Sequence, residues 1–409
     1  MSSGQATDVL KIEGKFYDTK GLAAIHPGGE LWVRLSNNTD ATAMFNTSHR
    51  RRFPHDKYKQ YEVPASKVPK GLIEEMDRDF TLFWEVCDKI KPVIGNTSGF
   101  APWTYWIKVF VILAVTFYLD FRAIFVGPVI ILSFVQGLFM GFIGLNLQHD
   151  ANHGAVSKNP TVNRLLGLTQ DYLGGVALMW MTNHNVVHHV HCNDADRDRD
   201  LQIPLLRLHN KVRWNSLYVV QQLYFTLLEA AFGLVHVFFN LYLIWRGPTK
   251  SQEILADYWN THKLMSFIFP VRVLACLFMQ GWAAVPHLAI VYSFGGAYLA
   301  FFFLMSHNFD GVEKTFDSTK GCFVKLQAET SSNVGGWLLA QFNGGLNYQI
   351  EHHLFPRIHH SLYPYMAPVV REICERNSIK YVHFPTVLDN AKSTYNHLLK
   401  MGQKPKVAV

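Results

Sequence analysis

The sequence predicts a mainly α-helical, polytopic membrane protein that carries a small α+β domain at its N-terminus. Apolar stretches long enough to cross a bilayer, which takes about 20 residues, recur between residues 103 and 305. Only 17% of the 409 residues are charged and 14% are aromatic, a composition that favours a membrane protein over several soluble domains. Clusters of histidine follow the apolar stretches, so the fold is expected to carry metal-binding side chains at the membrane boundary.

We divide the chain into three parts. Residues 1–64 form the N-terminal domain, residues 65–100 a charged linker that contains prolines, and residues 101–409 the membrane domain. The first residues lack the basic start and apolar core of a signal peptide, so we expect a cytosolic N-terminus. Within the linker, residues 71–84 have the apolar spacing of an amphipathic helix.

The N-terminal domain contains two histidines in informative positions. Residues 9–18 have the pattern of extended structure around a Gly-Lys turn, and His26 begins the tight turn His-Pro-Gly-Gly. His49 ends a helical stretch that begins with Asp-Ala-Thr. This part of the chain resembles a cytochrome b5 domain, and the resemblance implies that His26 and His49 are the axial ligands of a b-type haem. His55 is the alternative second ligand, in which case His49 would be a surface histidine beside three arginines.

We predict four transmembrane spans in the membrane domain. They lie at about residues 103–119, 123–147, 265–285 and 287–305. Asp120 and Arg122 mark the turn between the first two spans. Residues 165–181 are too polar for a span and are expected near the membrane interface.

Residues 217–245 are long enough to cross the membrane, but polar side chains interrupt them. A crossing here would also place the last histidine cluster on the opposite side of the membrane from the others. We therefore expect an interfacial helix. The alternative is that Glu229 and His236 line a cavity inside the protein.

Three histidine clusters carry the chemistry of the membrane domain. They have the pattern HxxxH at residues 149–153, HxxxHH at residues 184–189, and two adjacent histidines within residues 343–356. Residues four apart share one face of a helix, so each cluster presents neighbouring imidazoles to a common point. Iron, zinc, copper or nickel would accept such ligands, and their number exceeds the four of a zinc site and indicates two ions. The candidate ligands are His149, His153, His184, His188, His189, His352 and His353.

Two further features lie near the clusters. His307 follows the fourth predicted span and could join the metal site, although lone histidines are usually not ligands. His191 is a neighbour of the second cluster without an assigned role. The acidic residues between 194 and 200 either orient ligand imidazoles or form a solvated loop, and we favour the loop.

The three clusters, their order and the N-terminal His-Pro-Gly-Gly resemble the membrane fatty-acyl desaturase family, specifically its front-end branch fused to cytochrome b5. Gln349 is the diagnostic residue, because front-end members have glutamine where other desaturases have the first histidine of the third cluster. The resemblance covers nearly the whole chain. It implies a di-iron centre held by the candidate ligands named above, with His307 as an additional histidine and Gln349 as a coordinating or neighbouring catalytic group.

The resemblance also implies an oxidoreductase that uses O2 and acts on an acyl lipid or an acyl-CoA. It would place a cis double bond between an existing double bond and the carboxyl end of the acyl chain. Electrons from NADH would arrive through NADH-cytochrome b5 reductase and the fused haem. The expected location is the endoplasmic reticulum membrane, with several spans and with the histidine clusters in the cytosol.

Alternatives stay open at this point. A lipid hydroxylase would share the histidine clusters, and a sphingoid long-chain-base desaturase would share the glutamine and the haem domain. A histidine-lined metal transporter fits less well, because its ligands would lie within the spans. The net charge of +7 is spread along the chain and forms no block that would bind nucleic acid. The five cysteines are scattered without a CxxC pair, which argues against a disulfide framework.

Overall fold

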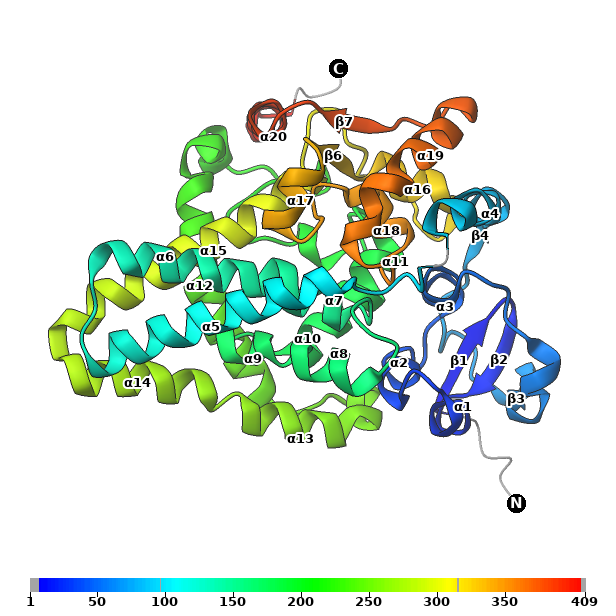
Figure 1. Cartoon of the computed structure of the whole chain (residues 1–409). Helices are drawn as coiled ribbons and strands as arrows, with labels where there is room; N and C mark the ends of the chain where they lie inside the picture. Colours follow the sequence, from blue (N-terminus) through cyan, green and yellow to red (C-terminus); the bar gives the residue numbers. More distant parts are fainter. Residues whose placement is uncertain (1–6, 96, 315, 406–409) are drawn as a thin grey trace.

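The computed structural model of the chain describes residues 7–95, 97–314 and 316–405. Figure 1 shows three parts: a small domain with a sheet, an elongated bundle of long helices, and a layer of shorter helices that holds most of the C-terminal residues. The mainly helical fold is as predicted from the sequence.

The N-terminal domain is a three-stranded sheet with helices on it. Strands β1 (Val9–Ile12), β2 (Lys15–Asp18) and β3 (Glu62–Val63) are antiparallel neighbours in that order. The β1–β2 turn has two consecutive positive φ angles, 47° at Glu13 and 84° at Gly14, which match the twist of a tight hairpin. The extended pattern of residues 9–18 is thus confirmed. The domain also contains α1 (Thr19–Ile25), α2 (Glu30–Leu35), α3 (Thr42–His49) and η1 (His55–Tyr61).

The linker belongs to the layer of shorter helices. After η2 (Ala65–Lys67), strand β4 (Asp77–Asp79) pairs in parallel with β5 (Lys320–Cys322), and helix α4 (Thr81–Ile94) follows. The amphipathic helix predicted at residues 71–84 is therefore wrong for its first ten positions. An Asp79 carboxylate oxygen accepts a hydrogen bond of 2.8 Å from the Thr81 amide and so helps to start the helix there.

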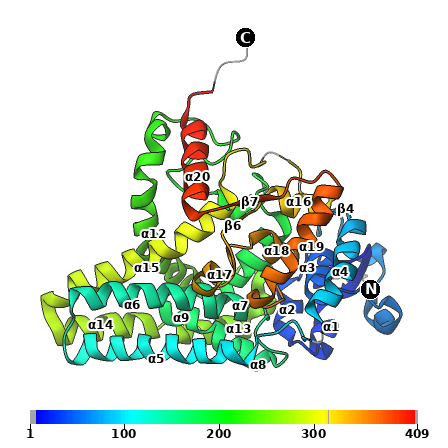
Figure 2. The ribbon, with the colours of Figure 1, turned by 45° about the horizontal axis from the view of Figure 1, so that its top comes forward.

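Long helices form the elongated bundle (Figure 2). They are α5 (Trp103–Phe125), α6 (Ile130–Phe142), α12 (Gln221–Arg246), α14 (Ile268–Gln280) and α15 (Ala284–His307). Helix α15 packs against both α6 and α12, and glycines allow the close approach. A Cβ atom on Gly295 would lie 2.8 Å from the carbonyl oxygen of Gly137 in α6, and one on Gly233 of α12 would lie 2.3 Å from that of Tyr292.

Within the part of the chain that the structure describes, three helical stretches are long and apolar enough to cross a membrane, namely Ile130–Asn152, Ser216–Arg246 and Gln252–His307. The predicted count of four spans is not confirmed. The third and fourth predicted spans fall in one 56-residue stretch, in which α14 has 13 residues and would reach about 20 Å.

The stretch expected at the membrane interface, residues 217–245, qualifies as a span by length and composition. Its polar residues Gln221, Glu229 and Asn240 are each at most 4% exposed, because they face neighbouring protein rather than the outer surface. These buried polar residues are therefore compatible with a helix that crosses the membrane, and they do not support the predicted interfacial helix.

The turn predicted at Asp120 and Arg122 is also wrong, because α5 continues to Phe125. The Asp120 carboxylate accepts hydrogen bonds of 3.0 and 2.9 Å from Arg272 of α14. Arg122 donates to the carbonyl oxygen of Gly127, where φ is 127° and the chain turns. Since both charges have partners, neither of them ends the helix.

The remaining elements connect the bundle and build the layer of shorter helices. Residues 165–181 form short helices and no span, as predicted. Strand β6 (Ser332–Val334) pairs in parallel with β7 (Val382–Phe384). The other elements are η3 (Ile143–Gln148), α7 (His149–Asn152), α8 (Pro160–Gly167), α9 (Thr169–Leu173), α10 (Ala177–Trp180), η4 (Met181–His188), α11 (His189–His191), η5 (Arg199–Leu201), η6 (Ser216–Val220), η7 (Lys250–Leu255), α13 (Ala256–Met265), η8 (Gly281–Ala283), α16 (Phe323–Glu329), α17 (Trp337–Asn343), α18 (Gln349–Leu354), η9 (His360–Leu362), α19 (Tyr363–Arg376) and α20 (Val387–Gly402).

The long helices bring the histidine clusters to one end of the bundle. In Figure 1 the α5–α6 and α14–α15 connections lie together at the far left, whereas α7, α11 and α18 gather at the opposite end, next to α2 and α3. The clusters therefore meet where the N-terminal domain contacts the bundle.

The ion pair between Asp120 and Arg272 allows a test of the bundle. We expect Asp120→Leu to lower the free energy of unfolding by about 3 kcal/mol, because it leaves a guanidinium that is 14% exposed without its anion. The Asp120→Leu/Arg272→Met double variant should recover most of this loss. Thermal unfolding of the purified protein in detergent measures both, and a double variant as unstable as the single one would contradict the role of the pair.

Candidate metal centre

The first histidine cluster directly follows a π-helical segment, and the second lies largely on one. Helix α6 runs into the π-helix η3, which ends just before His149 and α7. His184 and His188 lie on the π-helix η4, and His189 begins α11. A π-turn brings residues five apart together, and the Nε2 atoms of His184 and His189 lie 3.1 Å from each other. The sequence pattern predicted ordinary α-helices here, so it missed this pair.

The structure brings the predicted ligands together in two groups. Within each group, one ligand atom of every side chain lies within 4.8 Å of those of the others. Group A consists of His149, His153, His184 and His352. Group B consists of His188, Cys192, His307 and His353.

His189 lies between the two groups. Its ring centroid is 4.7 Å from that of His352 in group A and 4.3 Å from that of His353 in group B. Gln349 reaches group B, because its amide nitrogen is 2.8 Å from Nε2 of His307. The side-chain oxygen of Gln349 is buried and has no hydrogen-bond partner.

The ring nitrogens of the centre fit metal ions. Both ring nitrogens of His149 and the Nε2 atoms of His153, His352 and His353 are buried and find no hydrogen-bond partner among the described residues. Each buried polar atom left in this state costs about 1–3 kcal/mol unless another partner, such as a metal ion, is bound. The two groups could therefore hold one metal ion each.

The electrostatics of the centre favour the neutral form of five of its ligands. Burial, together with the neighbouring imidazoles, lowers the pKa of His153, His184 and His189 well below the usual value, and it does the same to the pKa of His352 and His353. Neutral imidazole is the form that binds a metal. These rings are thus ready to bind metal without first losing a proton.

The Asp198 carboxylate contacts the ring of His188 and fixes its orientation. This carboxylate is fully buried and lies 3.0 Å from Nδ1 of His188, while it also accepts a hydrogen bond of 2.7 Å from the Asn193 amide. Burial alone would lower the pKa of His188, but Asp198 more than offsets it and the pKa rises to about 9. The preferred reading of the acidic run as a solvated loop is wrong for Asp194 and Asp198, which are buried, and holds for the exposed Asp196.

Three other ligand imidazoles also have a fixed orientation. Nδ1 of His353 lies 2.9 Å from the side-chain oxygen of Gln327, and Nδ1 of His352 lies 3.2 Å from the Tyr363 hydroxyl. Nδ1 of His307 lies 3.0 Å from the carbonyl oxygen of Thr330. Such partners fix the tautomer, so that Nε2 of His352 and His353 would be free to bind a metal, while Nε2 of His307 lies next to the amide nitrogen of Gln349. None of them has a sequence signal, because each comes from a distant segment.

Cys192 is the group-B member that the sequence analysis missed. It is 3% exposed, and its Sγ lies 3.4 Å from Nδ1 of His307. Its position four residues after His188 was an available signal. His191, by contrast, points away to Ser318, whose hydroxyl is 2.8 Å from its Nδ1.

The N-terminal domain contributes the pair His26 and His49. Their ring centroids are 6.0 Å apart. Nδ1 of His26 lies 2.8 Å from the carbonyl oxygen of Gly29, and Nδ1 of His49 lies 3.0 Å from that of Phe45. Both histidines therefore keep Nε2 available. Both nitrogens of His55 are engaged, with Tyr17 at 2.6 Å and Glu13 at 3.0 Å.

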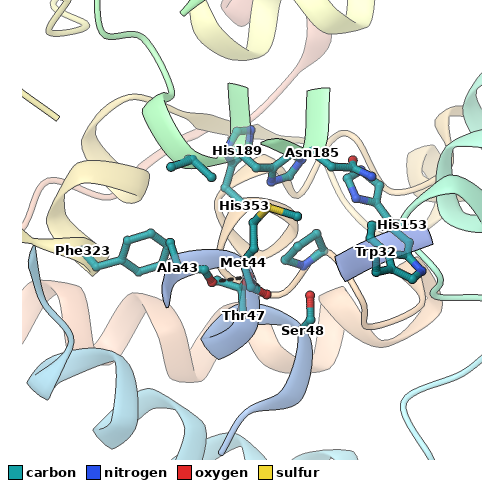
Figure 3. A pocket seen from close by; sticks show the side chains of 12 residues that line it. Trp32, Ala43, Met44, Thr47, Ser48, His153, Asn185, His189, Phe323 and His353 are labelled. Atoms are coloured by element: carbon teal, nitrogen blue, oxygen red, sulfur yellow. Dashed lines mark hydrogen bonds between the residues drawn. The ribbon is translucent and has the colours of Figure 1, made fainter. Parts of the chain in front are cut away.

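A small hollow lies between α3 of the N-terminal domain and the metal centre. Figure 3 shows Met44, Thr47 and Ser48 of α3 on one side of it and the rings of His189 and His353 on the other. The helix that ends in His49 thus faces ligands of both groups.

Comparison with known proteins identifies the chain. The family model described as fatty acid desaturase matches residues 125–385. This chain belongs to the fatty acid desaturase family. It is 38% identical to the acyl-lipid (7-3)-desaturase of Rebecca salina, over 98% of this chain and 92% of that protein. It is 37% identical to the acyl-lipid (7-3)-desaturase of Diacronema lutheri, over 97% of this chain and 91% of that protein. It is 28% identical to the acyl-lipid (8-3)-desaturase of Physcomitrium patens, over 96% and 88%.

The predicted relationship to front-end desaturases is confirmed by these relatives. The desaturase is therefore an oxidoreductase that acts on acyl lipids, and its buried histidine groups could hold metal. Its apolar helices agree with a membrane protein.

Asp198 gives a test of the metal centre that does not depend on catalysis. We expect Asp198→Asn to weaken metal binding at group B by about 10- to 100-fold, because His188 loses the carboxylate that orients it. The metal content of the purified desaturase, measured by mass spectrometry after dialysis against a chelator, reports the loss. Asp196→Asn is the matched control, because Asp196 is exposed and pairs with Lys211. Equal metal content in both variants would contradict the assignment.

Proposed function

We propose that this chain is a front-end desaturase that introduces a cis double bond into an unsaturated acyl lipid, between an existing double bond and the carboxyl end. The observation that carries the proposal is the position of the Gln349 amide nitrogen, 2.8 Å from Nε2 of His307, inside a centre built mainly from histidine. The relatives named acyl-lipid desaturases support it and favour a lipid-linked chain over an acyl-CoA.

The proposed cofactor of the centre is a pair of non-haem iron ions, which activate O2 for the removal of hydrogen from unactivated carbon. His149, His153, His184 and His352 would hold one ion, and His188, His307 and His353 would hold the other. His189 would be a further ligand, and Gln349 would be a coordinating or neighbouring group. Imidazole ligands carry no charge, so the centre keeps the positive charge of its metals.

The surroundings of the centre keep water out. Trp180 stacks on His184 with ring centroids 4.3 Å apart, and Phe303 lies 6.2 Å from both His149 and His184. All eight histidines of the centre are at most 7% exposed. In a dry site an acyl chain can meet the oxidant without side reactions with water.

The proposed electron donor to this centre is a b-type haem held by His26 and His49. The ring centroids of the two histidines are 6.0 Å apart, which leaves room for one metal ion with bonds of about 2 Å to a nitrogen of each ring. The engaged nitrogens of His55 favour His49 as the second ligand. We propose NADH-cytochrome b5 reductase as the partner that reduces the haem, on the cytosolic side of the endoplasmic reticulum membrane.

The reaction can be tested in yeast supplied with polyunsaturated fatty acids. We expect a new double bond on the carboxyl side of an existing one, detected by gas chromatography and mass spectrometry of total lipids, including sphingoid bases. Substitutions His352→Ala and Gln349→Ala should each abolish the product, because they remove groups from the centre. His383→Ala is the control, since His383 is exposed and lies outside both groups. A hydroxylated lipid or an altered sphingoid base would assign the protein to another reaction.

The haem makes a separate prediction. We expect His49→Ala to remove the absorption spectrum of a haem with two imidazole ligands from the purified protein, and to reduce desaturation less than His352→Ala if free cytochrome b5 can replace the fused domain. His55→Ala should keep the spectrum. The opposite result for the two variants would make His55 the second ligand.

A further inference from the structure

A guanidinium group from the membrane domain lies over the His-Pro-Gly-Gly turn. Arg357 follows the third histidine cluster, four positions after His353. A Cβ atom on Gly28 would lie 3.5 Å from Nη2 of Arg357, and one on Gly154, next to His153, would lie 3.6 Å from its Nε. Arg357 thus stands between the haem histidines and the metal centre.

The side chain of Arg357 has no anionic partner within residues 7–95, 97–314 and 316–405. Among the residues that the structure describes, its side chain forms no hydrogen bond and no ion pair, although it is partly buried. The nearest charged groups are alike in sign: burial and Arg50 together lower the pKa of Arg357. Arg50 is equally unpaired within the same described residues, and a Cβ atom on Gly99 would lie 3.3 Å from its Nη1.

Two unpaired guanidinium groups close together are unfavourable unless an anion binds between or beside them. A guanidinium offers a planar fork of donors that matches a carboxylate. Haem carries two propionate carboxylates. The imidazoles that would hold its iron belong to His26 and His49, and the positive charge of Arg357 contributes to lowering the pKa of both. The donor set and its position therefore fit a haem carboxylate.

We propose that Arg357, with Arg50 beside it, binds a propionate carboxylate of the haem held by His26 and His49. The inference rests on the haem proposed above and adds that the membrane domain completes the haem site. Arg357 acts as a binding and positioning residue that joins the haem to the segment carrying His352 and His353. Its positive charge favours the reduced haem, which carries one positive charge fewer than the oxidised form.

The experiment uses the full-length protein purified with its haem in detergent. The absorption spectrum and the midpoint potential of the haem are measured for the wild type, Arg357→Gln and Arg357→Lys. We expect Arg357→Gln to keep the spectrum and to lower the equilibrium constant for haem reduction about tenfold, which is 59 mV for one electron. Arg357→Lys keeps the charge and should recover most of this shift.

Arg371→Gln is the matched control. Arg371 is exposed on α19 and donates a hydrogen bond of 2.7 Å to Glu375, so we expect no change in potential. If Arg357→Gln does not fold, Arg50→Gln replaces it, with an expected shift in the same direction of about threefold.

Each outcome decides the inference. An unchanged potential in Arg357→Gln, or in Arg50→Gln when that variant is used, overturns the role of these arginines and leaves the haem itself in place. If the wild-type protein shows no haem spectrum, or if His49→Ala does not remove that spectrum, both the haem held by His26 and His49 and this inference are overturned. The desaturation proposed above is judged separately, by the lipid product and its loss in His352→Ala.

Discussion

Eight buried imidazoles that share one small volume are the constraint on which the rest of this structure depends. Such rings cannot all find protein partners, and several nitrogens have none. Neutral rings that face two common points are stable together when cations bind there, so the folding of three distant segments and metal binding support each other. The π-helical segments, the buried Asp198 and the polar partners of the rings all serve this arrangement.

The arrangement of the domains follows from the same centre. The long helices place their histidine-bearing ends together, and the N-terminal domain sits directly behind them (Figure 1). Helix α3 ends in His49 and borders the hollow that the metal-binding rings also line. Arg357 belongs to the membrane domain, and its guanidinium lies next to the His-Pro-Gly-Gly turn of the N-terminal domain. Contact between the two domains is therefore built from residues next to their reactive groups.

Secondary structure was predictable where the local pattern was strong. The hairpin of residues 9–18 and the presence of long apolar helices follow from local sequence, because turn chemistry and hydrophobic length act over a few residues. Helix ends and the choice of spans were less predictable. Asp120 and Glu229 looked like interruptions, but each is accommodated by neighbouring helices that the sequence does not place.

By itself, the sequence determined the family and predicted the three histidine clusters as ligands, since ligand chemistry favours this residue type at short spacings, while His307 was assigned only through the resemblance to the family. Only the tertiary structure decided how the rings divide into two groups, that His189 lies between them, and that Cys192 belongs to one of them. Asp198, Gln327 and Tyr363 became recognisable in the same way. The physical reason is that a ligand's partner is selected by distance in space, and most of these contacts join segments that are far apart in the chain.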